Sequence, residues 1–184
     1  MTKKIKFIYS KKQDQKCLLR YSRFIKKHGS IWGRNTNIKP IIKLTKVNLE
    51  ANISEIIIAY NKIFKVKPFK IKGYLVTTPF SMINDDEKFN SRESIIFYSI
   101  YNLFGYPPSI VLAHEIFHIY FEKYTQRKIP NYEETKEYFT IIMNDIFGKE
   151  VSKGYPNHYD IRAKILNIWK NTHSIDECIK IVSE

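Results

Sequence analysis

Two histidines lie four residues apart, with a glutamate directly after the first, in the run HEIFH that begins at His114. On an α-helix this spacing places the imidazoles of His114 and His118 on one face, close enough to bind a single Zn²⁺ ion. The carboxylate of Glu115, beside them, can take a proton from a water held by that ion. Apolar residues at helical spacing would pack the back of this helix: Ile110, Ala113, Phe117 and Phe121. The pattern therefore predicts a zinc site on a helix.

Two imidazoles alone would hold zinc weakly, so a third protein ligand is expected. Glu122, four residues after His118, is the first acid after the motif. On a straight helix, however, Glu122 and His114 are about 12 Å apart along the axis, too far for one ion. We expect Glu122 to be solvated, or to contact a ligand rather than the ion.

Three glutamates crowd the first two turns of the next expected helix. Glu134 stands three residues after Asn131, at the position of a capping-box acid, and Glu133 lies in the first turn, where the helix dipole favours a carboxylate. Glu137 lies past the first turn, beside apolar residues, where an unpaired carboxylate is costly. Glu137 is therefore the expected third ligand, with Glu134 and Glu133 as the alternatives.

HEIFH, followed 19 residues later by a glutamate on a second helix, resembles the gluzincin group of zinc metallopeptidases. The familiar member of that group is thermolysin, and its small intracellular relatives include the minigluzincins and ImmA/IrrE-type proteins. These families place a sheet with a substrate-binding edge strand before the HExxH helix and a glutamate helix after it. The order of residues 93–100, 109–124 and 131–147 is similar, and the resemblance covers about residues 71–150.

The resemblance implies hydrolysis of peptide bonds, with zinc as the cofactor, a peptide or protein as the substrate and Glu115 as the general base. It also implies a donor that stabilises the oxyanion. His158, in the first turn of a helix opened by Asn157, is the first candidate, and Tyr155 is the second. We expect His28 and His173 to be surface groups; for Asp145, an exposed position is favoured over a role in orienting a ligand histidine.

The chain departs from the gluzincin pattern after the expected ligand. Gluzincins often carry an acid four residues after the glutamate ligand, and here that residue is Ile141. If Glu133 were the ligand, Glu137 would supply that acid, so both assignments stay open. The segment KEYFTIIMND also lacks the small residues of the ImmA/IrrE glutamate helix.

Hydrophobic periodicity predicts the elements that must position these residues. Helices are expected over residues 14–28, 48–65, 109–124 with Ser109 as N-cap, and 131–147 with Asn131 as N-cap, and two more start at Asn157 and Ser174. Strands are expected over residues 71–78 and 93–100, with a loop or long hairpin over residues 81–92 and a loop over residues 29–46. The expected fold is α+β, with a small, mostly antiparallel sheet.

Basic residues are concentrated at the start of the chain. Residues 1–46 contain 14 Lys or Arg and one acid, whereas the rest of the chain carries no net charge. We expect residues 1–46 to form a basic segment with one amphipathic helix and residues 47–184 a zincin-like catalytic domain, together one compact domain. The basic segment could contact nucleic acid or an anionic surface weakly, although an ordinary solvated helix face is the favoured interpretation.

Two classes of protein therefore remain: a zinc peptidase, and a nucleic-acid-binding protein whose HExxH residues are structural or inactive. Cys17 and Cys178 have no metal-binding spacing and are expected to be buried thiols. No apolar run is long enough to span a bilayer, and the N-terminus lacks a signal-peptide pattern. We therefore expect a cytoplasmic protein without a transmembrane segment.

Overall fold

The computed structural model describes residues 5–20, 22, 26, 37–78, 81–83, 93–101, 106–148 and 154–183. The chain divides into two compact units. The first comprises Met1–Ser54 and Pro68–Glu115, and the second comprises Glu55–Lys67 and Ile116–Glu184. The division expected at residue 46 falls inside a helix, α3 (Lys39–Phe64), and the described part of the basic segment belongs to the first unit.

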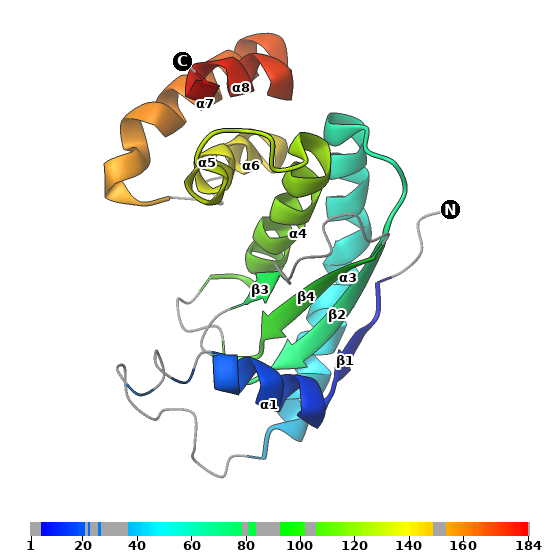
Figure 1. Ribbon diagram of the computed structural model, residues 1–184. Coiled ribbons are helices and arrows are strands. Elements are labelled where there is room, and N and C mark those ends of the chain that lie inside the picture. The colour runs from blue at the N-terminus through cyan, green and yellow to red at the C-terminus, as the bar shows by residue number, and fades with distance from the viewer. Residues whose placement is uncertain are drawn as a thin grey trace. The chain divides into compact units, whose positions relative to one another are not determined.

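The first unit contains a mixed four-stranded sheet (Figure 1). Its strands are β1 (Phe7–Tyr9), β2 (Lys70–Val76), β3 (Met82–Ile83) and β4 (Glu93–Ser99), in the order β1-β2-β4-β3. The α+β class is confirmed, but the prediction of a mostly antiparallel sheet is wrong. Among the described strands, β2 runs parallel to both β1 and β4, and only the short β3 pairs antiparallel, with β4. The segment between β2 and β4 therefore does not form a hairpin that joins them.

The resemblance placed a substrate-binding edge strand before the HExxH helix, and β4 precedes that helix along the chain. β4 is an inner strand, because β2 and β3 flank it on its two sides. Among the described strands, β3 and β1 are the edges of the sheet. β3 lies within residues 81–92, the stretch that was expected to be a loop or a long hairpin.

A helix at the start of the chain packs onto this sheet. Cys17 of α1 (Lys11–Arg20) lies in one buried cluster with Val76 and Phe97 of the sheet. The buried carboxylate of Asp14 accepts hydrogen bonds from the backbone N–H of Thr77, at 2.7 Å, and from its hydroxyl. These bonds satisfy a carboxylate that would otherwise be costly to bury. Residues 21–28 of the expected helix lie largely outside the described residues.

α3 begins earlier than its apolar periodicity predicts. The helix starts at Lys39, within the segment that was expected to be a loop because of Pro40. Proline fits the first turn of a helix, where its missing N–H would have no intrahelical partner. The residues that pack α3 against its surroundings are buried at helical spacing: Leu49, Ile53, Ile56, Tyr60 and Phe64.

The second unit is helical. It contains α5 (Tyr132–Phe139), α6 (Ile142–Ile146), the 3-10 helix η2 (Pro156–His158), α7 (Tyr159–Thr172) and α8 (Ile175–Ser183), together with the C-terminal parts of α3 and α4 (Pro108–Thr125). The single helix expected over residues 131–147 is wrong, since α5 ends before Thr140 and α6 begins after Ile141. The core of this unit is largely aromatic: Tyr60, Phe64, Phe117, Phe121 and Phe139.

Of three N-cap residues predicted for the helices, one is confirmed and two are wrong. The hydroxyl of Ser174 accepts the backbone N–H of Glu177 at 3.3 Å, so the N-cap of α8 is confirmed. Asn131 is wrong as a side-chain cap: it has a left-handed backbone with φ 45° and makes no side-chain cap bond. Ser109 lies inside α4, where the carbonyl of Pro107 accepts the first helical N–H groups instead.

The two cysteines are buried free thiols, as expected. Within the described residues, no helix combines the length and the apolar character that crossing a membrane requires.

Candidate metal centre

The two histidines of the HExxH run lie one turn apart on α4. The helix is continuous from Pro108 to Thr125, so the four-residue spacing does place both imidazoles on one face. His118 is buried, with 4% of its surface exposed, and His114 is half-buried. Phe117 and Phe121, each three residues after one of the histidines, stack on each other with ring centroids 5.9 Å apart. Aromatic packing therefore fixes the helix that carries both histidines.

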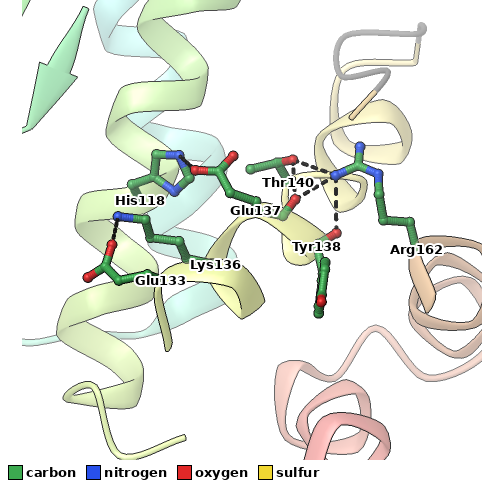
Figure 2. A network of polar contacts seen from close by, with 7 residues as sticks. All are labelled: His118, Glu133, Lys136, Glu137, Tyr138, Thr140 and Arg162. Atoms are coloured by element: carbon green, nitrogen blue, oxygen red, sulfur yellow. Dashed lines mark hydrogen bonds and ion pairs between the residues drawn. The ribbon is translucent and has the colours of Figure 1, made fainter. Parts of the chain in front are cut away.

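Glu137 of α5 lies next to His118 (Figure 2), and it forms a group of possible ligands with both histidines. Its Oε1 is 3.2 Å from Nε2 of His118, and one ligand atom from each of His114, His118 and Glu137 lies within 4.8 Å of the other two. Ligand atoms about 2.0–2.1 Å from a tetrahedral zinc ion lie roughly 3.4 Å from one another. The 3.2 Å between Glu137 and His118 is close to this spacing, and the donor set, two imidazole nitrogens and one carboxylate oxygen, could hold a metal ion such as zinc.

The side chains of Glu133 and Glu134, the two alternative candidates for the third ligand, contact other residues. Glu133 is 65% exposed at its side chain and pairs with Lys136, one turn further along α5 (Figure 2). Oε1 of Glu134 lies 3.3 Å from Nε2 of His158. Burial, together with a hydrogen bond to Glu134, raises the pKa of the Tyr138 hydroxyl to about 12. Of the three expected candidates, only Glu137 joins the two histidines in a group of possible ligands.

Glu122 is buried, so a solvated side chain, the first of its two expected states, is wrong, and contact with a metal ligand stays a prediction. It is 8% exposed, and its Oε1 lies 3.2 Å from Nε and 3.0 Å from Nη2 of Arg127. The guanidinium of Arg127 also lies over the ring of Tyr132, at 5.3 Å from the centroid. The charge of Glu122 is thus balanced by arginine, which explains how an acid is tolerated at this buried position.

Asp145 and His173 are exposed, as expected. Asp145 accepts a hydrogen bond from the indole N–H of Trp169 at 2.9 Å, and the ring of His173 lies edge-on to the same indole. His28 lies outside the described residues.

Glu115, the expected general base, is buried on the same helix, with 8% of its surface exposed. Burial and the nearby charge of Glu115 both raise the pKa of the Tyr98 hydroxyl, burial having the larger effect. That hydroxyl donates a hydrogen bond to the carbonyl of Pro108 at 3.1 Å. Glu115 is therefore largely shielded from solvent. In such a site, a proton being transferred does not readily leak to bulk water.

The two expected oxyanion donors lie around η2. His158 is buried, and its contacts are with Glu134, with the ring of Tyr138 at 4.7 Å and with the ring of Tyr155 at 5.4 Å. Tyr155 is 59% exposed. Because Nε2 of His158 faces a carboxylate, this nitrogen would have to leave Glu134 to reach a substrate. The role of oxyanion donor stays a prediction for both residues.

Sequence reasoning missed Arg162. This residue of α7 is 2% exposed, and its Nη1 donates hydrogen bonds to the carbonyl oxygen of Glu137 and to the hydroxyl of Thr140. A signal was present, because Arg162 shares the buried face of α7 with Ile165 and Trp169. A charged residue at a buried helical position is normally paired, but the periodicity does not name its partner.

Comparison of the chain with protein-family models, with curated proteins and with solved structures finds no match.

Proposed function

We propose that the chain is a zinc-dependent peptidase that binds the ion through His114, His118 and Glu137. The convergence of these three donors from two helices carries the proposal. Catalytic zinc sites use three protein ligands and leave a fourth position for water or substrate, whereas structural sites fill all four positions with protein. A set of two histidines and one glutamate matches the first pattern.

Bound zinc would supply Lewis acidity, lowering the pKa of water toward about 7 and polarising a substrate carbonyl. Glu115 follows His114 directly, and its carboxylate would accept the proton of the attacking water. The same carboxylate would then return the proton to the nitrogen of the leaving amine. Its burial supports this role, because a shielded carboxylate exchanges protons with its neighbours more readily than with solvent.

The mixed sheet also supports a peptide as the substrate. β3 is an antiparallel edge strand among the described strands, and an edge strand can pair with an extended peptide through its backbone groups. Backbone pairing holds a substrate by its main chain and leaves its side chains to set the preference. The proposed substrate class is therefore a peptide or an unfolded protein segment.

The direct test is the metal content of the purified chain. We expect one zinc ion per chain, removed by a chelator and restored by added zinc, with hydrolysis of a fluorogenic peptide library lost and regained in parallel. A metal-free chain that shows no zinc affinity would overturn the proposal. If such a chain also bound nucleic acid in a strongly salt-dependent way, the alternative function of the basic segment would replace it.

Glutamine substitutions separate the three glutamates of α5. Glu137→Gln should weaken zinc binding by about 100-fold or more, because loss of a direct ligand should cost at least as much as loss of an outer contact. Glu133→Gln is the matched control, since its exposed side chain pairs with Lys136, and it should leave zinc affinity unchanged. Glu134→Gln should alter the contact with His158 but not zinc affinity. Competition with a chromogenic chelator measures all three, and a larger loss at Glu133 than at Glu137 would reassign the ligand.

A further inference from the structure

The main-chain carbonyl of Glu137 is held by side chains from two segments (Figure 2). Nη1 of Arg162 donates to this oxygen at 2.5 Å, and the hydroxyl of Thr140 donates to it at 2.7 Å. The same Nη1 lies 2.8 Å from the Thr140 hydroxyl and 3.4 Å from the carbonyl of Tyr138. The backbone N–H of Thr140 also donates to the Glu137 carbonyl, at 3.3 Å, so the side-chain donors add to the backbone bond that closes the end of α5.

The guanidinium of Arg162 is itself fixed. It is almost fully buried, and it lies against Gly154, whose φ is +70°. A Cβ at Gly154 would lie 2.6 Å from Cζ of Arg162, so only glycine leaves room for the guanidinium there. A buried cation is strongly destabilising unless it is well paired. The packing around the guanidinium therefore defines the position of the Arg162 side chain.

We propose that Arg162 is a positioning residue for the Glu137 ligand, holding the end of α5 so that the carboxylate stays next to His118. The inference rests on the proposed function. The Glu137 side chain is 26% exposed, so without a fixed main chain it could turn toward solvent. Groups that orient metal ligands typically contribute 10-fold to 100-fold to metal affinity.

A second hydrogen bond between helices of this unit offers a matched control. The carboxylate of Asp145 on α6 accepts the indole N–H of Trp169 on α7 at 2.9 Å. Like the Arg162 bonds, this contact joins α7 to the segment that follows Glu137, but it does not involve Glu137 itself. Loss of this hydrogen bond should lower the free energy of unfolding without moving the carboxylate of Glu137.

The test compares R162M, R162K and D145A with the unsubstituted chain. Zinc affinity is measured by chelator competition, and the visible absorption bands of the cobalt-substituted protein report the geometry of the site. R162M should lose zinc affinity by about 10-fold to 100-fold and shift the cobalt bands, and R162K should recover part of the loss because it keeps the charge and one donor. D145A should lower the unfolding midpoint and change neither metal readout.

Four results would overturn the inference. R162M could match the unsubstituted chain in zinc affinity, or D145A could lose as much zinc affinity as R162M, which would make Arg162 merely structural. If R162M does not fold, Thr140→Val removes one donor to the Glu137 carbonyl; it should weaken zinc binding, and Thr140→Ser should restore it. Unchanged affinity in Thr140→Val would overturn the inference too. No zinc binding by the unsubstituted chain would overturn the proposed function along with it.

Discussion

Glu115→Gln should leave the chain folded and its zinc content unchanged while peptide hydrolysis falls by about 10²-fold to 10⁴-fold. Glutamine has the shape of glutamate, so it fills the same buried space on α4, but it cannot accept a proton. Because Glu115 is not among the residues grouped as possible ligands, its loss should not release the ion. The measurements are zinc per chain and the initial rate of cleavage of a fluorogenic peptide library.

Glu122→Gln provides the matched control for this substitution. Glu122 is an acid on the same helix with the same 8% exposure, and it pairs with Arg127 rather than lying among the possible ligands. The amide oxygen of glutamine can still accept from Arg127, so hydrolysis should remain near the unsubstituted rate. Loss of zinc in Glu115→Gln would show that Glu115 is a ligand and that another group moves the proton. Equal loss of hydrolysis in both variants would point to a general disturbance of α4.

The arrangement around α4 was predictable because it depends on short-range geometry. The four-residue spacing of His114 and His118 fixes their relation on any regular helix. Glu137 was favoured by elimination, since Glu133 and Glu134 had simpler explanations at the start of a helix. The structure groups Glu137 with both histidines, although the capping role assumed for Glu134 is replaced by its contact with His158.

The direction of the strands was not predictable in the same way. β2 and β4 each show residues typical of a strand, and that composition is similar for parallel and antiparallel neighbours. Pairing in the sheet depends on contacts distant along the chain, such as Gly73 opposite both Phe7 and Ile96. β1 has only three residues, too few for an alternating pattern to stand out from the basic sequence around it.

The break between α5 and α6 was missed for a related reason. Residues 131–147 keep a helical apolar period across the break, so the sequence itself shows no stop signal at Thr140. The interruption is stabilised by Arg162, which lies more than twenty residues further along the chain and donates to carbonyls at the end of α5. A helix end that depends on a distant donor cannot be recognised from the local sequence.

Replacing either histidine should have the largest effect on metal binding. His114→Ala and His118→Ala each remove one of three proposed ligands, and the remaining two cannot hold zinc against water and a chelator. We expect zinc affinity to fall by more than about 100-fold, beyond the range usual for outer contacts, and hydrolysis to disappear with the ion. His114→Ala is the better test of metal binding, because His114 is half-buried. His118 is more deeply buried, and its loss also leaves a cavity.

His173→Asn is the matched control for the loss of a histidine. His173 is exposed at the end of α7 with a left-handed backbone, φ 48°, which asparagine tolerates well. Zinc content and hydrolysis should both stay unchanged in this variant. Far-ultraviolet circular dichroism of each variant would separate loss of metal from loss of fold. If folded His114→Ala and His118→Ala chains each kept one tightly bound zinc, these histidines would not be ligands and the peptidase proposal would fail.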